Sequence, residues 1–220
     1  YWHDNHGFDP AVEGWAYDFY DKTKRNRTNL SQEIRLSIGS IILGGYFKHL
    51  KEQDEAIGYL FGGIATNAWS AYDFKAMAGY AQYEHALSPP LKLKANVRFE
   101  QNTMDYKGSS EGLNENWEKV VLPPVKFNVE HSMLGYRGSI HYLKDEFTSF
   151  YGSVSQGYKS GGVNQQPYLS DKNRPFDPEF IQNFEIGLKR ATDIYRTQLS
   201  AFYSKRNDQH GSISSQQDKE

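Results

Sequence analysis

The stretch "LKLKANVRFE", Leu91 to Glu100, decides the fold class because its apolar and polar residues alternate without a break. Every odd-numbered residue is apolar, and every even-numbered residue is charged or an amide. A period of two residues is typical of a β-strand, whose successive side chains point to opposite faces. Its length of about ten residues is what a tilted strand needs to cross a membrane. A half-buried strand of a soluble protein would alternate in the same way, but such strands are usually shorter.

The same alternation recurs in "QEIRLSI", "MLGYRGSIHYL" and "YRTQLSAFY". Other stretches are strand-like in their content of β-branched and aromatic residues. Together they predict eight strands, at 31–38, 41–51, 72–87, 91–102, 131–143, 147–158, 181–191 and 195–206.

The connections between these strands alternate in length. Within each successive pair of strands the connection is a few residues, as at Gly39-Ser40, whereas 52–71, 103–130 and 159–180 join the pairs. Compact soluble β domains mostly use short connections. Outer-membrane barrels have short periplasmic turns and long extracellular loops. We therefore predict an all-β, antiparallel transmembrane β-barrel segment of four hairpins, with 1–30 as an outer loop and 208–220 as the start of another.

Composition removes several other classes of protein. The 220 residues include 25 basic and 27 acidic ones, which gives a formal charge of -2. This charge does not favour general electrostatic binding to nucleic acid. The absence of cysteine excludes disulfides, thiolate zinc sites and cysteine nucleophiles. No apolar run approaches the roughly 20 residues of a spanning helix. No nucleophile-elbow or zinc-protease motif appears, so no catalytic residue is predicted. The chain begins at Tyr1 without a signal peptide, which we interpret as processing or a fragment.

Several segments resemble, in order, the barrel of TonB-dependent outer-membrane receptors, most closely the siderophore-receptor-like branch. They are "SQEIRL", "GGYF", "GYAQYEHAL", "LKLKANVRFE", "SFYGSVSQGYKSGGVN", "FDPEFIQNFEIGLK" and "LSAFYSKRND", and they span about 31–208. The resemblance implies a monomer of about 22 strands with a plugged lumen, of which this chain is a mid-barrel part without the plug. It also implies uptake of a scarce solute, with a ferric siderophore favoured, driven by the TonB complex and needing no cofactor.

Two sets of candidate site residues follow. In relatives, ligand-binding residues commonly lie in outer loops, so the resemblance makes the loop after 159 a candidate for substrate contact. Its candidates are Asn164, Gln165, Tyr168, Lys172 and Arg174. If the apolar faces meet lipid, the polar faces line the lumen, where they would contact the plug or an anionic ligand. The lumen-facing set is Lys92, Lys94, Asn96, Arg98, Arg137, His141, Arg196 and Gln198.

Two motifs resemble a phosphate-binding loop or a metal site, but the rest of the sequence supports neither. In "SQGYKSGG", Ser155 to Gly162, the lysine precedes the glycine pair and no helical pattern follows, so it is not a phosphate-binding P-loop. We expect Tyr158 in an aromatic girdle and the two glycines releasing the chain into an outer loop. "HDNH", His3 to His6, lacks further ligands at argued positions, so a solvated loop is favoured over a metal site.

Two alternatives remain open from the sequence. A complete eight-stranded passive barrel, acting in adhesion or anchoring, would require the first and last strands to pair. A soluble β-sandwich binding module would require the apolar faces to form an internal core.

Overall fold

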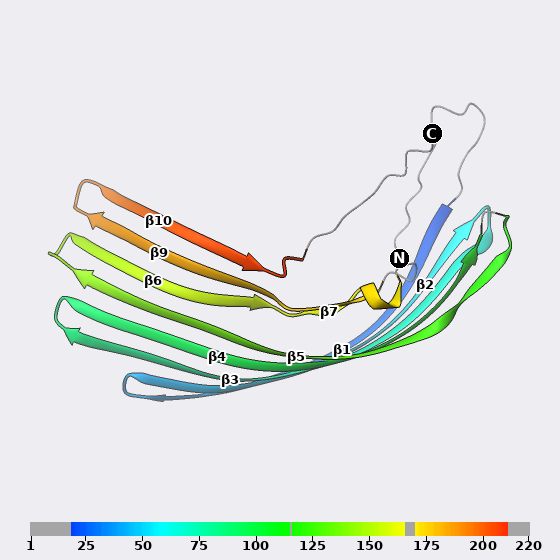
Figure 1. Ribbon diagram of the computed structural model, residues 1–220, viewed down its shortest axis with the longest axis horizontal. Helices are drawn as coiled ribbons and strands as arrows, with labels where there is room; N and C mark the ends of the chain where they lie inside the picture. Colours follow the sequence, from blue (N-terminus) through cyan, green and yellow to red (C-terminus); the bar gives the residue numbers. More distant parts are fainter. Residues whose placement is uncertain (1–18, 115, 166–169, 211–220) are drawn as a thin grey trace, which may run out of the picture.

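The computed structural model describes residues 19–114, 116–165 and 170–210. Most of them form one antiparallel sheet of eight strands, in which each strand pairs with the next in the order β1-β2-β3-β4-β5-β6-β9-β10 (Figure 1). These strands are β1 (Phe19–Ile38), β2 (Ile41–Leu60), β3 (Gly63–Ser88), β4 (Leu91–Leu113), β5 (Lys119–Leu143), β6 (Thr148–Lys159), β9 (Glu179–Ala191) and β10 (Arg196–Asn207). The predicted all-β, antiparallel fold is confirmed.

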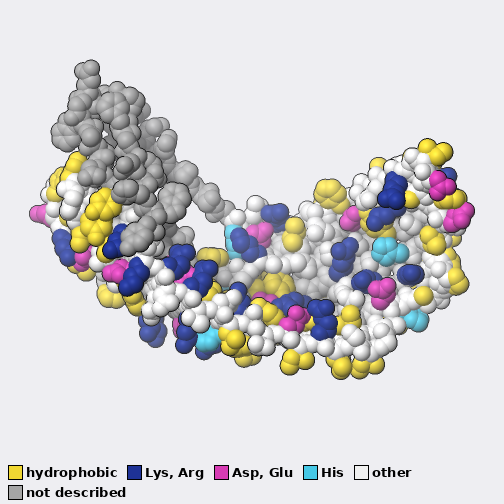
Figure 2. Space-filling model, turned by 180° about the vertical axis from the view of Figure 1, so that it is seen from behind, with side chains coloured by type: hydrophobic (Ala, Val, Ile, Leu, Met, Phe, Trp, Pro, Cys, Tyr) yellow, Lys and Arg dark blue, Asp and Glu magenta, His cyan; other side chains and the backbone are white. Residues whose placement is uncertain are grey.

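The sheet is curved, and its two faces differ in chemistry. Large apolar side chains stand exposed on the convex face of all eight strands, and Figure 2 shows them in yellow along the lower edge of the molecule. They include Ile34, Leu36, Leu43, Met77, Val97, Phe99, Leu134, Ile140, Phe150, Val154, Phe184, Ile186 and Leu199. An apolar surface of this extent is not stable in water, so it marks a face that is covered in the native environment.

The strands fall into two length classes. β6, β9 and β10 have 12 or 13 residues, close to what a membrane crossing needs, whereas β1 to β5 have 20 to 26. The segments 52–71 and 103–130, predicted as connections, are therefore mostly strand, and so are residues 19–30 of the predicted outer loop. Beyond the apolar belt both faces of these strands carry polar residues, which removes the alternation that identifies a strand in the sequence.

Both alternative architectures disagree with this sheet. β1 and β10 are its two edges and do not pair, which contradicts a closed eight-stranded barrel. Within the described ranges the only other sheet is the two-stranded pair of β7 and β8, so the apolar faces form no sandwich core. The eight strands are an open part of a wall.

The connection from β6 to β9 folds back onto the concave face. It contains β7 (Gly162–Val163), the 3-10 turn η1 (Asp171–Asn173) and β8 (Pro175–Phe176), and Figure 1 places β7 and η1 inside the curve of the sheet. Val163 packs with Met104 and Tyr106 in a small buried cluster. This cluster fixes the loop against β4.

The glycine pair after β6 makes close contact instead of releasing the chain outward. Gly161 and Gly162 are both buried. A Cβ at Gly161 would lie 2.4 Å from the Phe176 carbonyl oxygen and 2.6 Å from Cε1 of His131. The prediction that these two glycines release the chain into an outer loop was wrong. Glycine is needed here because two backbone segments approach each other closely.

The expectation that Tyr158 belongs to an outward aromatic girdle was also wrong. Its hydroxyl accepts a hydrogen bond of 3.1 Å from Nε of Arg98 and lies 3.2 Å from a carboxylate oxygen of Glu100. Both partners lie on the concave face. A tyrosine hydroxyl that is partly removed from water favours such polar partners over the apolar belt.

Two tyrosines on the concave face cover glycines of the neighbouring strand. Tyr80 lies over Gly44, its register partner, and Tyr151 lies over Gly187 in the same relation. A Cβ on Gly44 would lie 2.0 Å from Cζ of Tyr80. A cross-strand ring over a glycine restores the packing that the missing side chain leaves out.

Substituting the two neighbouring glycines of β2 tests this packing. Gly44→Val places methyl groups inside the Tyr80 ring, and we expect it to destabilise the full-length protein by about 1–3 kcal/mol through overpacking. Gly45→Val is the matched control, because a Cβ added at this position on the convex face would have no atom within 4 Å. Heat-modifiable migration on a gel measures the temperature of unfolding. An equal fall in the temperature of unfolding in both variants would contradict the contact between the Tyr80 ring and Gly44.

Gly161→Ala tests the inward position of the loop. The added methyl group clashes with backbone of β8, so we expect amide hydrogen exchange at Asn164 to rise at least about 10-fold, because its N–H is held by the Arg174 carbonyl at 2.7 Å. The control is Gly157→Ala, whose nearest neighbour would be Cγ2 of Ile181 at 3.5 Å. Unchanged exchange in Gly161→Ala would mean that the loop does not depend on this contact.

Candidate functional site

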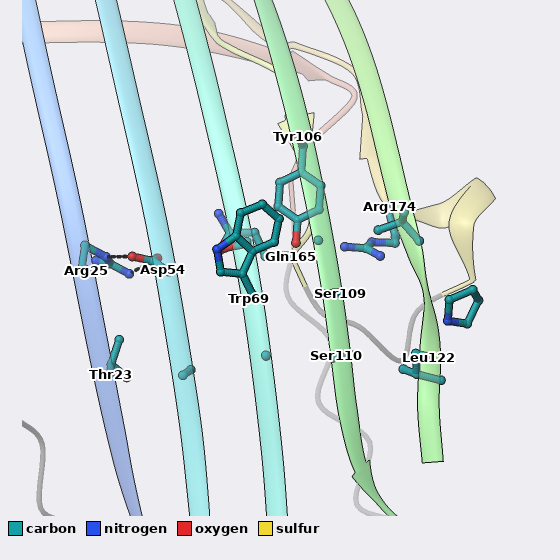
Figure 3. Close-up of a pocket in the computed structure, with 16 residues that line it drawn as sticks. Thr23, Arg25, Asp54, Trp69, Tyr106, Ser109, Ser110, Leu122, Gln165 and Arg174 are labelled. Carbon is teal, nitrogen blue, oxygen red and sulfur yellow. Dashed lines mark hydrogen bonds and ion pairs between the residues drawn. The ribbon is translucent and has the colours of Figure 1, made fainter. Parts of the chain in front are cut away.

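A cavity of about 270 Å³ lies on the concave face, above the level of the apolar belt. Its walls come from β1 to β5 and from the loop between β6 and β9, which contributes Gln165 and Arg174 (Figure 3). No helix in the described part of the chain is long and apolar enough to cross a membrane.

Arg174 is the most unusual residue of this cavity. It is only 3% exposed, and its guanidinium carbon lies 5.2 Å from the ring centroids of both Tyr106 and Phe127. Its Nε donates a 3.1 Å hydrogen bond to the backbone oxygen of Asn164. Two ring faces stabilise the cation, since a guanidinium is attracted to aromatic quadrupoles. No carboxylate among the described residues forms an ion pair with it.

The opposite wall holds Asp54, and Glu52 lies two residues before it on the same face of β2; both are paired with arginines of β1. Asp54 accepts two hydrogen bonds from Arg25, at 2.7 Å from Nε and 2.8 Å from Nη2. Glu52 accepts a hydrogen bond from Arg27. Figure 3 shows the Arg25–Asp54 pair on neighbouring strands, across the cavity from Arg174. Because each buried carboxylate has its own arginine, neither compensates the charge of Arg174.

Tyr72 lies beside Glu52 and is held neutral. Burial raises the pKa of Tyr72 to about 12, with the Glu52 carboxylate as a second, smaller cause. The phenol therefore stays protonated at any physiological pH and can donate a hydrogen bond.

A second, more open hollow of about 440 Å³ lies on the concave face at the height of the apolar belt. It is lined by three arginines, Arg35, Arg98 and Arg137. Arg98 donates a 2.6 Å hydrogen bond to Glu100. Arg35 lies 3.2 Å from Glu33 and donates to the Tyr80 hydroxyl at 3.1 Å. Arg137 forms no ion pair within the described chain, so its charge remains available to another group.

The predicted loop residues divide between the cavity and the solvent. Gln165 and Arg174 line the cavity, and Asn164 meets Arg174 through its backbone. Lys172 lies exposed on η1 and does not line the cavity. Tyr168 lies outside the described residues.

The predicted lumen residues share the concave face. Lys94 forms an ion pair of 3.1 Å with Glu84, and Lys92 lies opposite His141 in the register of β4 and β5. Arg98 and Arg137 meet in the second hollow, whereas Arg196 stands exposed at the start of the edge strand β10. Their role toward a plug or a ligand stays a prediction.

Sequence reasoning missed the cavity's other main residues. Arg25, Asp54 and Tyr106 lie in segments that were predicted as loops. A usable signal exists at Tyr106, because Met104 and Tyr106 again alternate with polar residues beyond the predicted end of their strand, but with the apolar residues now on the opposite face from Val97 and Phe99.

The possible metal motif at His3 to His6 lies outside the described residues. Among residues that are described, no group of three or more His, Asp or Glu is placed to hold a metal ion.

Comparison with solved structures gives the same architecture. The chain is similar to the ferric yersiniabactin uptake receptor of Yersinia pestis, with a TM-score of 0.74 and 18% identity, over 87% of this chain and 30% of that one. It is also similar to the alcaligin outer-membrane receptor of Bordetella pertussis, with a TM-score of 0.50 and 12% identity, over 90% of this chain and 32% of that one. The chain thus spans about a third of the length of these receptors. The comparison with curated protein sequences found no match.

The family model for the β-barrel of TonB dependent receptor-like proteins matches residues 2–219. That match covers nearly the whole chain and agrees with the open antiparallel sheet, its apolar convex face and its polar concave face. The chain therefore belongs to the TonB-dependent receptor family and forms part of the β-barrel of an outer-membrane receptor.

Proposed function

We propose that the complete receptor takes up a ferric siderophore or a similar scarce solute, and that the cavity around Arg174 contacts this ligand. The observation that carries the proposal is the Arg174 guanidinium, which is buried at the cavity, lies over two neighbouring aromatic rings and is unmatched by any described carboxylate. Burying a charge is costly unless a partner compensates it. An anionic ligand supplies that partner.

The chemistry of the cavity favours a small anionic or oxygen-rich ligand. A guanidinium is planar and binds pairs of oxygens in a fixed geometry. Ferric siderophores present carboxylate, hydroxamate or catecholate oxygens, and aromatic residues such as Tyr106 suit their flat ring systems. The similar receptors named above carry ferric yersiniabactin and alcaligin in their names, which supports the same ligand class.

We infer that the arginines of the second hollow face the plug of the complete receptor. The shared hollow of Arg35, Arg98 and Arg137 on the concave face supports this inference, because acidic or carbonyl groups of a plug inside the barrel would pair with them. In this proposal the TonB complex acts on the plug, and the barrel supplies a monomeric wall in outer-membrane lipid. No catalytic residue is needed, because the partner complex supplies the energy.

Uptake by cells tests the function as a whole. Cells that express the complete receptor are expected to accumulate radiolabelled iron presented as a ferric siderophore, and removal of TonB is expected to abolish this accumulation. Haem and cobalamin serve as competing ligands in the same assay. TonB-dependent uptake of one of these in place of every ferric siderophore would contradict the proposed ligand class.

Arg174→Met tests the ligand site itself. The change keeps an unbranched side chain over the two rings but removes the charge, so we expect the Kd for the ferric ligand to rise at least about 10-fold, since a charged hydrogen bond contributes about 1.5–3 kcal/mol. Isothermal titration calorimetry on the complete receptor measures this change.

Lys172→Met is the matched control, because it removes a cation from the same loop at an exposed position outside the cavity. Its Kd is expected to stay within about 2-fold of the wild type. Equal weakening in both variants would indicate a general charge effect, and no change in Arg174→Met would remove the cavity from the binding site.

A further inference from the structure

Four aromatic side chains form a row on the concave face, beside the cavity that holds Arg174. Phe74 and Tyr72 are neighbours on one face of β3, with ring centroids 6.1 Å apart and an angle of 9° between the ring planes. Tyr72 is the register partner of Tyr106 on β4, whose ring centroid lies 6.4 Å from that of Phe127 on β5. These four residues, which we call the aromatic row, all belong to or pack against the buried cluster under the inward loop.

A cation lies at each end of the aromatic row. Arg174 lies over the rings of Tyr106 and Phe127 at one end. At the other end, Nζ of Lys48 on β2 lies 5.9 Å from the ring centroid of Phe74. Alternation along β2 puts Lys48 on the same, concave face as the buried acids of this strand. Both cations are close enough to be attracted to the ring faces beneath them.

Lys48 resembles Arg174 in having no carboxylate partner among the described residues. It is partly buried, whereas the other lysine of β2 is exposed. The acids on neighbouring rows of the concave face have their own arginines, because Glu52 pairs with Arg27 and Glu33 pairs with Arg35. The aromatic row therefore ends, on both sides, in a positive charge that an anionic group of a ligand can neutralise.

One small ligand can span the two cations. Lys48 is on β2, and the rings under Arg174 are on β4 and β5, two and three strands away in the sheet. Adjacent strands lie about 4.8 Å apart, so the two ends of the row are about 10–14 Å apart. A ligand that reaches both ends lies over the half-buried rings of Phe74 and Tyr72. Aromatic groups are favoured in that position, since pairs of rings attract one another beyond the burial of their area.

We propose that Lys48 and Phe74 form a second subsite beside the Arg174 cavity, and that the two subsites together select a ferric complex whose aryl arms carry acidic oxygens, as phenolates and catecholates do. This inference rests on the proposed function, because it presupposes a ferric ligand at Arg174, and it narrows the class of that ligand. A hydroxamate or an aliphatic carboxylate would make the contact with a cation but not the contact with the rings.

Three ferric complexes test the ligand class on the complete receptor. A ferric triscatecholate is anionic and aromatic, ferric citrate is anionic without rings, and a ferric trishydroxamate is neutral without rings. We expect the Kd of the wild type for the triscatecholate to be at least about 10-fold lower than for the other two complexes, because only the triscatecholate contacts both the cations and the rings. Isothermal titration calorimetry measures the three values. Equal or tighter binding of the citrate or trishydroxamate complex would overturn the assignment to an aryl ligand.

Substitutions at Lys48 and Phe74 test the second subsite. Lys48→Met removes the charge but keeps an unbranched side chain, and we expect it to raise the Kd for the triscatecholate at least about 5-fold. Lys48→Arg keeps the charge, and its Kd is expected to stay within about 2-fold of the wild type. Phe74→Leu removes the ring but keeps an apolar side chain, so we expect the Kd for the triscatecholate to rise at least about 3-fold and that for ferric citrate to stay unchanged.

Lys75→Met is the matched control, because Lys75 follows Phe74 in the chain but stands exposed on the convex face. Its Kd is expected to match the wild type, and heat-modifiable migration shows that each variant is folded. If Arg174→Met weakens binding of the triscatecholate and Lys48→Met does not, the second subsite is overturned while the proposed function stands. If the wild type binds none of the three ferric complexes, the proposed function fails and the second subsite fails with it.

Discussion

Continuous backbone pairing across the eight strands is the constraint on which the other features depend. In lipid no water is present to satisfy a backbone N–H or C=O group, so each strand must pair along its full crossing length. The antiparallel pairing runs from each strand to the next, from β1 to β10. Because side chains alternate with a period of two, the register also assigns each residue to a face, and a slip of one residue would turn Arg98 into the lipid and Phe99 into the lumen.

The same constraint explains how much the sequence could predict. Where a strand crosses the membrane, one face must be apolar and the other can be polar, so the alternation of 91–100 is readable without a structure. Above the belt, both faces meet water, and a segment such as Gln53-Asp54-Glu55 shows no alternation although it is strand. The short turns next to the belt could therefore be predicted from the sequence, whereas the extension of the strands beyond the belt could not.

The inward loop could not be read from local sequence for a different reason. Arg174 is stabilised by Tyr106 and Phe127, and Gly161 is required by Phe176 and His131. Most of these partners lie more than 25 positions away along the chain, so no short motif records the contacts. "SQGYKSGG" has the pattern of a strand running outward, but its glycines are the point where the chain turns back onto the concave wall.

The charged residues of the concave and convex faces differ in burial and in pairing. On the concave face, the buried acids Glu52 and Asp54 are each matched by an arginine, which leaves Arg174 as a buried charge without an ion pair among the described residues, whereas Arg137 is exposed. On the convex face, the lysines without an ion pair among the described residues, such as Lys75, Lys107 and Lys126, are exposed to water, which solvates their charges.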